Sequence, residues 1–362
     1  NLKLSLRVQL GTCISNLLLS SKNDALKTQL FPLALNAILL KHGGMVGGLL
    51  TLQCLTNSVL KGPDLQKLFN ESIPTLLQSG ESLHAVIVNE LNLFASLGNA
   101  PQEQREASAN QILNGFETMR VLTETLKNFT VKLENTKGPL LFSVTKQTNL
   151  LVLYFKVLYL YINTEYQIRD CIISTCGYSK LDDVINEVKI KVLKSINIMT
   201  EFVFEANEDI EDNPSSDFIE IVTKMLPLMI STVIKFCKTD KIDITHHLGN
   251  PSVECVLTEV MSFLTKMCSQ KQYYTLFAEI KKTLVVDVIF PLLRTIESEK
   301  DVILEDPLEF VHLSLDCCDK QLSGTFKTQA AQFMERLCES IDGTLTFVAV
   351  IAFNLLDYSI SS

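Results

Sequence analysis

The chain has 362 residues, of which 47% are hydrophobic and 20% charged, and its formal net charge is −9. This hydrophobic content excludes a disordered or fibrous protein. The negative charge argues against a general nucleic-acid-binding surface, which needs clustered Lys and Arg. A basic partner is one interpretation of this charge, and the ordinary acidity of cytosolic proteins is the other.

Apolar residues recur at helical spacing along the whole chain, and no run of clean strand-like alternation occurs. We therefore predict an all-α protein. The expected helices span 3–20, 25–41, 46–60, 64–78, 81–97, 102–114, 116–134, 140–163, 165–175, 181–205, 216–238, 252–270, 273–297, 307–320, 325–341 and 344–357.

Four prolines lie inside apolar runs rather than before them, namely Pro32, Pro74, Pro227 and Pro291. An internal proline removes a backbone hydrogen bond and kinks a helix, so this recurrence suggests a repeated unit. Pro32 and Pro74 are 42 positions apart, within the period of HEAT and armadillo repeats. We predict one helical-repeat array over residues 1–362, a HEAT-like right-handed α-α superhelix.

Both ends of the sequence fall within or just after an apolar helical pattern, and the chain begins without Met. We expect it to be a fragment of a longer protein.

The longest apolar run, residues 149–162, is too short to span a bilayer. It predicts a core helix and no membrane insertion.

An acidic stretch, residues 205–217, interrupts the apolar pattern without a single basic residue. It predicts an exposed loop between two helices. One interpretation is a solvated linker, and the other is a contact for a basic partner. The candidate partner-binding residues are Glu205, Glu208, Asp209, Glu211 and Asp212.

The sequence lacks the usual signatures of cofactor, metal or catalytic sites. The ten cysteines are scattered without a C-x-x-C pair, which indicates buried thiols in a reducing compartment. His246 and His247 lie near Asp243 and Cys255, but adjacent helical side chains diverge by about 100°, which suits a single zinc ion poorly. We predict no cofactor, no metal and no enzymatic activity.

The stretch "ILEDPLEFVHLSLDCCD", residues 303–319, gathers acids that resemble a site. Asp306 suits a helix N-cap, Pro307 the first helical position, and Glu309 the third, where it can bond back to the cap. The spacing predicts a structural helix start. A hydrolase built on Asp306 and Glu309 is the disfavoured alternative.

The order "VVDVIFPLLRTIESEKDVILEDPLEFVHLSLD", followed by "TFKTQAAQFMERLCE", resembles a segment of the importin-β superfamily. It is similar to the branch of importin seven, importin eight and the exportin that recycles importin-α. That branch has a "VIFPLL"-like helix, an acidic turn, an "EDPxEF/Y" helix start and a "TxxxAAxxFxxxLC" helix. A basic residue usually follows the "EDPxEF/Y" start, whereas Val311 and His312 stand here.

This resemblance implies a nuclear transport receptor, or karyopherin, that wraps basic protein cargo under Ran-GTP control and moves between cytoplasm and nucleus. It implies Ran-GTP, basic cargo and nucleoporins as partners. We expect no direct nucleic-acid binding, because the net charge is −9. The family's first Ran contacts would precede Asn1. The alternative function is a cytosolic HEAT-repeat scaffold or adaptor subunit, which would not respond to Ran.

Overall fold

The computed structural model describes residues 24–40, 43–58, 62–98, 100–135, 144–164, 166–177, 181–209, 251–293 and 326–361, with ten further positions between 220 and 234. Every regular element in these ranges is a helix, so the predicted all-α fold is confirmed. Two predicted helices, 3–20 and 307–320, lie outside the described residues. The chain divides into two compact units, Asn1–Val222 (unit 1) and Thr223–Ser362 (unit 2).

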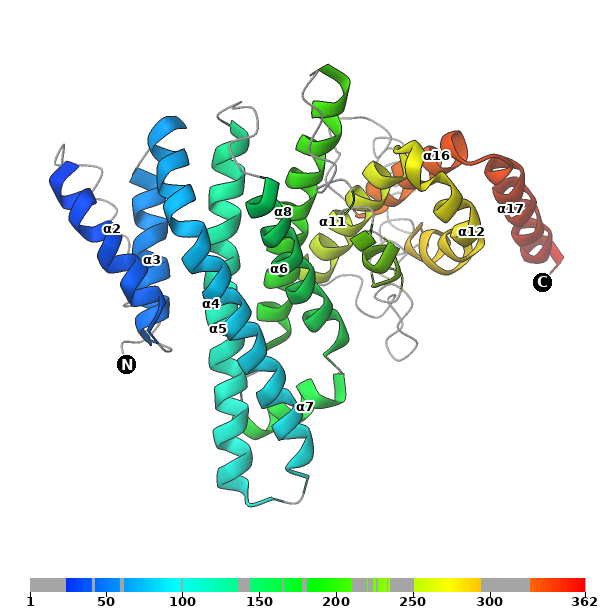
Figure 1. The fold of residues 1–362 in the computed structure, drawn as a ribbon. Helices are drawn as coiled ribbons and strands as arrows, with labels where there is room; N and C mark the ends of the chain where they lie inside the picture. Colours follow the sequence, from blue (N-terminus) through cyan, green and yellow to red (C-terminus); the bar gives the residue numbers. More distant parts are fainter. Residues whose placement is uncertain are drawn as a thin grey trace, which may run out of the picture. The chain divides into compact units, whose positions relative to one another are not determined.

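The described part of unit 1 is built from α-helices (Figure 1). Their bounds are α2 Asp24–Ile38, α3 Gly43–Ser58, α4 Gly62–Ser96, α5 Gln102–Asn135, α6 Val144–Asn163, α7 Tyr166–Cys176 and α8 Leu181–Asp209.

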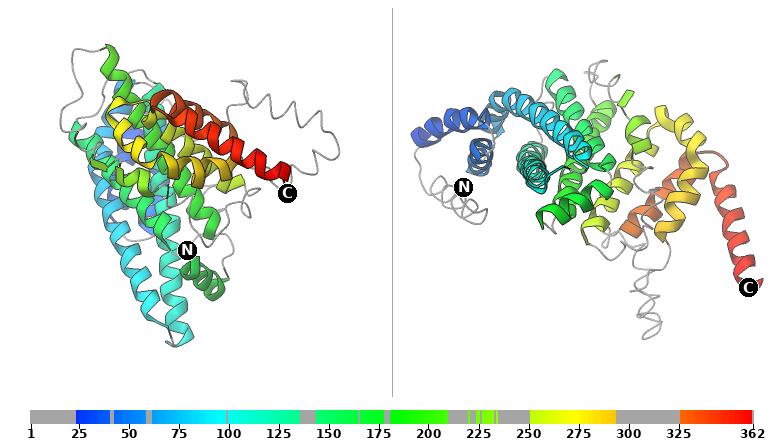
Figure 2. Two further views of the ribbon diagram at one scale, coloured as in Figure 1. Left: turned by 90° about the vertical axis from the view of Figure 1, so that its right-hand side faces the viewer. Right: turned by 90° about the horizontal axis from the view of Figure 1, so that it is seen from below.

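These helices form three stacked pairs, α2 with α3, α4 with α5, and α6 with α8. The first members of the pairs also contact one another, as α2 with α4 and α4 with α6. The second members do the same, as α3 with α5 and α5 with α8. Figures 1 and 2 show α4 and α5 side by side from three directions. Stacked pairs whose like members form two layers are typical of helical-repeat solenoids, as predicted.

Two predicted helix breaks are wrong. Segments 64–78 and 81–97 form the single helix α4, and segments 102–114 and 116–134 form the single helix α5. The glycines at these points serve close packing. A Cβ on Gly80 would lie 2.7 Å from Leu153 Cδ2, and one on Gly115 would lie 2.7 Å from Ile87 Cγ1. Both helices therefore continue through a glycine that lets a neighbouring side chain approach.

Helix α5 contacts α3, α4, α7 and α8, although its composition is polar for such a central helix. Four of its threonines are buried, and each hydroxyl donates to the backbone carbonyl four residues earlier, at 2.6–3.0 Å. Each hydroxyl is therefore satisfied within its own helix, which removes most of the penalty for burying it. These threonines are Thr118, Thr123, Thr125 and Thr130.

Unit 2 comprises α11 Pro251–Cys268, η1 Lys271–Tyr273, α12 Tyr274–Leu284, η2 Val285–Ile289, α13 Phe290–Leu293, α16 Phe326–Ser340 and α17 Thr344–Ser361. Helix α11 begins at Pro251, one residue before the start of the predicted helix 252–270. It packs along α16, and Phe277 of α12 meets Phe333 of α16 edge to face, with ring centroids 6.2 Å apart. An apolar core therefore joins these helices.

The internal prolines have different local effects. Pro32 and Pro74 lie within the unbroken α-helices α2 and α4. Pro291 instead follows the π-helical segment η2, where the N–H of Phe290 donates to the carbonyl of Val285, five residues earlier. A proline ring clashes with the carbonyl four residues before it. A wider turn directly before Pro291 is one way to relieve that clash.

Candidate partner-binding surface

The predicted acidic segment is only partly described. Helix α8 runs to Asp209, beyond the predicted end at residue 205, so Glu205, Glu208 and Asp209 lie in its last turns rather than in a loop. Glu211 and Asp212 lie outside the described residues. The predicted helix start at Asp306, Pro307 and Glu309 also lies outside them. A partner-binding role for the acidic residues stays a prediction.

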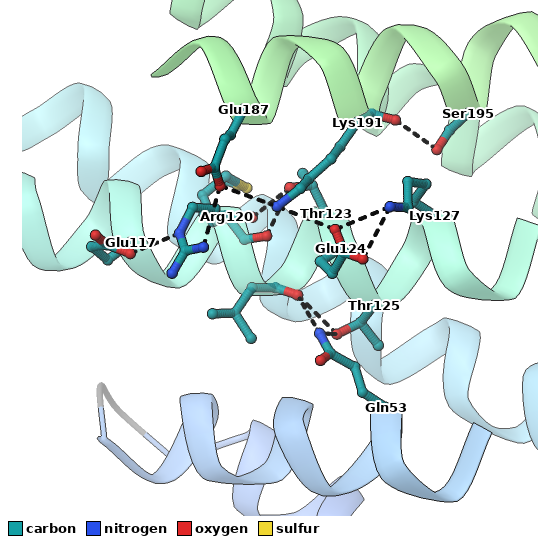
Figure 3. Close-up of polar contacts among 12 residues, drawn as sticks. Gln53, Glu117, Arg120, Thr123, Glu124, Thr125, Lys127, Glu187, Lys191 and Ser195 are labelled. Carbon is teal, nitrogen blue, oxygen red and sulfur yellow. Dashed lines mark hydrogen bonds and ion pairs between the residues drawn. The ribbon is translucent and has the colours of Figure 1, made fainter. Parts of the chain in front are cut away.

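A charged cluster that the sequence analysis missed connects α5 to α8 (Figure 3). We call it the ion-pair ladder. It comprises Glu117, Arg120, Glu124 and Lys127 on α5, and Glu187 and Lys191 on α8. Three acids face three bases, so the ladder as a whole is electrically neutral.

Two of its contacts cross between the helices. Arg120 Nη1 lies 3.2 Å from Glu187 Oε2, and Lys191 Nζ lies 3.2 Å from Glu124 Oε2. The remaining contacts lie within one helix. Arg120 Nε lies 2.9 Å from Glu117 Oε2, Lys127 Nζ lies 3.0 Å from Glu124 Oε1, and Lys191 Nζ lies 3.4 Å from Glu187 Oε2. Glu124, Lys191, Glu187 and Arg120 thus form a continuous chain of alternating charge.

The ladder is partly open to solvent. Its side chains range from 15% exposed at Lys191 to 46% exposed at Glu187. Burial acts to raise the pKa of Glu124, but the hydrogen bonds and charges of Lys127 and Lys191 outweigh it, and the pKa is lowered. Burial likewise acts to lower the pKa of Arg120, and its contacts with Glu117 and Glu187 outweigh this, so the pKa is raised. The contacts within the ladder therefore favour the charged forms of Glu124 and Arg120.

Hydrogen bonds to neutral oxygen atoms connect α3 to α5. Gln53 Nε2 donates to Thr125 Oγ1 at 2.9 Å and to the carbonyl of Val121 at 3.2 Å. Lys132 Nζ donates to the carbonyl of Thr56, in the last turn of α3, at 2.6 Å. A cation suits this position because the carboxyl end of a helix carries partial negative charge.

Two basic side chains are buried at the other end of unit 1. Arg169 of α7 is 3% exposed, and its Nη2 donates to the carbonyl of Tyr161 at 3.1 Å, while its Nη1 lies 3.4 Å from Asp182 Oδ1. Lys189 of α8 is 1% exposed, and its Nζ lies 3.5 Å from Asn186 Oδ1. Arg169 therefore ties α7 to the end of α6 and the start of α8.

Burial lowers the pKa of Lys189 well below its ordinary value of 10.5, and the charge of Arg169 adds to the shift. A lysine with a lowered pKa can act as a nucleophile where a substrate reaches it. Lys189 lies within the packed helices at 1% exposure, so its place in the fold is structural.

Other candidate chemistry is partly outside the described residues. Asp243, His246 and His247 lie there, whereas Cys255 is exposed on α11. Within the described ranges, no group of three His, Cys, Asp or Glu side chains is placed to hold a metal ion. None of the helices in those ranges combines the length and apolar character needed to cross a membrane.

The ladder has only a partial signature in the sequence. Glu117 and Arg120, and Glu124 and Lys127, stand three residues apart, and Glu187 and Lys191 stand four apart, which are spacings of neighbours on a helix surface. The contacts between helices join residues 67 positions apart. These contacts depend on how α5 lies against α8, which no local spacing specifies.

Comparison with known proteins identifies one similar family. Residues 216–359 match the family model described as Cse1. This segment covers most of unit 2 and less than half of the chain. No curated protein and no solved structure matches the chain. The Cse1 family is exportin- and importin-β-like, so the match supports the karyopherin superfamily predicted from the sequence without distinguishing the branch.

Proposed function

We propose that this chain is part of a nuclear transport receptor that wraps basic protein cargo on its stacked helical pairs and releases it under control of Ran-GTP. The observation that carries the proposal is the Cse1 match over residues 216–359. The Cse1 family consists of transport receptors rather than enzymes, so the same match favours a non-enzymatic role.

The architecture of unit 1 supports the proposal independently. Three stacked pairs present a continuous layer of helices, α3, α5 and α8, to whatever lies against it. In such arrays each pair contacts mainly its neighbours, so small rotations between pairs add up. A partner can therefore be enclosed or released through many small adjustments.

The acidic residues support a basic cargo. The five candidates are Glu205, Glu208, Asp209, Glu211 and Asp212, and three of them fall in the last turns of α8. Negative residues near the carboxyl end of a helix add to the negative end of its dipole. A Lys- or Arg-rich segment bound there would offset this unfavourable combination.

Cargo binding is tested by changing the five candidate acids to Gln or Asn and measuring binding of a basic cargo, such as a histone, by calorimetry at two salt concentrations. We expect weaker binding and a smaller salt dependence. The matched control changes five exposed acids elsewhere to Gln, which gives the same net charge. These are Glu71, Glu81, Glu103, Glu279 and Glu335. Equal binding by both variants would contradict a role of the acidic segment.

Ran control is tested on the full-length protein that contains this chain. We expect it to bind Ran-GTP in preference to Ran-GDP and to exchange cargo when Ran-GTP is added. We also expect it to bind nucleoporins and to shuttle between cytoplasm and nucleus. If the full-length protein does not distinguish Ran-GTP from Ran-GDP, the alternative function, a cytosolic helical-repeat scaffold or adaptor, is favoured.

A further inference from the structure

In the layer formed by α3, α5 and α8, the contact between α3 and α5 and the contact between α5 and α8 use different polar interactions. Between α3 and α5, Gln53 and Lys132 donate only to neutral oxygens. Between α5 and α8, two ion pairs of the ladder connect the helices, Arg120 with Glu187 and Lys191 with Glu124. Of these two contacts, only the one between α5 and α8 contains ion pairs between helices among the described residues.

We propose that the ion-pair ladder is an electrostatic latch that holds the third helical pair of unit 1 against the second and loosens as ionic strength rises. The inference is independent of the proposed function, because the ladder lies in unit 1, outside the segment that matches Cse1.

The exposure of the ladder supports a response to salt. Exposed ion pairs are screened by dissolved ions, and the Debye length falls from about 10 Å at 0.1 M salt to about 3 Å at 1 M. Lys191 is 15% exposed and Glu187 46%, so ions reach the ladder from its Glu187 side. Single exposed pairs contribute little, but charges arranged in a network contribute together.

The connectivity of the ladder explains why it acts as a unit. Lys191 Nζ contacts both Glu124 and Glu187, so one side chain on α8 joins the two halves of the ladder. Loss of Lys191 leaves Glu124 with Lys127 and Glu187 with Arg120. One of the two ion pairs between the helices then disappears and the chain of alternating charge is cut.

The test is hydrogen–deuterium exchange of the whole chain at 0.05, 0.2 and 1 M NaCl, normalised to an unstructured reference peptide. In the unaltered protein we expect the exchange of α8 amides to rise about threefold over this range, while that of α3 amides stays nearly constant. In a Glu124→Gln, Glu187→Gln variant, α8 should exchange faster already at 0.05 M and respond little to salt.

Three further variants keep the test decisive. Lys191→Gln should lose most of the salt response with a single change, and Lys191→Arg should retain it. Glu81→Gln removes an isolated ion pair with Lys156, 2.8 Å long, between α4 and α6. It is the matched control and should leave the response of α8 unchanged. An equal salt response of α8 in the unaltered protein and in Lys191→Gln would overturn the proposal, and so would no response in either.

Discussion

The two units join their helices with different chemistry. In unit 1, glycine residues allow side chains of neighbouring helices to come close, and ion pairs connect α5 to α8. In unit 2, Phe277 of α12 packs edge to face against Phe333 of α16, and the ion pair of Arg336 with Glu339 lies within α16. Both units bury apolar side chains between their helices. We infer that unit 1 responds to salt and pH, whereas unit 2 responds mainly to the loss of apolar volume.

The largest expected effect is in unit 2. Phe333 is fully buried against Phe277, so Phe333→Ala should lower the free energy of unfolding by about 3–5 kcal/mol. Urea unfolding followed by circular dichroism measures the loss, and hydrogen exchange should localise it to α11, α12 and α16. The loss should be the same at low and high salt. If the loss of unfolding free energy depended strongly on salt, unit 2 would not differ from unit 1 in the way we infer.

A smaller effect is expected where glycine permits close contact in unit 1. Gly115→Val would place a side chain 2.7 Å from Ile87 Cγ1 and should cost about 1–3 kcal/mol. Gly47→Val is the matched control, because a Cβ there meets nothing within 4 Å. Urea unfolding of the two variants should differ. Equal stability would mean that α4 and α5 adjust freely around Gly115.

The buried lysine of unit 1 predicts a pH effect. Because the pKa of Lys189 is lowered well below 10.5 in the folded chain, the unfolded chain binds the extra proton between the folded pKa and 10.5. Stability should therefore rise with pH across this window, by up to about 1.4 kcal/mol per pH unit for one proton.

The check is urea unfolding of the unaltered protein and of Lys189→Met between pH 6 and 9.5, below the range where buried tyrosines titrate. The variant removes the titrating group, so the difference between the two curves isolates Lys189. We expect this difference to shrink or reverse in favour of the unaltered protein as pH rises. A difference independent of pH would show that Lys189 keeps its ordinary pKa.

The smallest effect is expected at the isolated surface pair. Glu81 and Lys156 are about half exposed, so Glu81→Gln should change the free energy of unfolding by no more than about 0.5 kcal/mol. The same substitution at Glu187, inside the ladder, should cost more at low salt. Equal costs measured by urea unfolding would remove the distinction between a network and a single pair.

Local patterns were sufficient for the fold class and insufficient for the polar contacts. Helical periodicity predicted the all-α fold, and it placed the start of α11 within one residue of Pro251. Gly80 and Gly115 were misread as breaks, because a glycine that permits close packing has the same local signature as one that ends a helix. The position of Leu153 or Ile87 decides between these roles, and that position is a tertiary property.

The ladder could not be predicted for a related reason. Its spacings within α5 and α8 are common on any solvated helix. Its contacts between helices require a particular alignment of Arg120 with Glu187, which arises from apolar packing along the rest of both helices. The acidic segment, by contrast, stands out in the sequence, and α8 extends into it by four residues more than predicted.

The continuity of α4 through Gly80 has a mechanical consequence. A helix of 35 residues is about 52 Å long at 1.5 Å per residue. If it tilts as a stiff rod about one end, a rotation of about 5° displaces the other end by roughly 5 Å. Two shorter helices joined at a flexible glycine would absorb the same rotation at their junction. The unbroken α4 therefore acts as a lever that converts a small change at one end into a displacement the size of a side chain at the other.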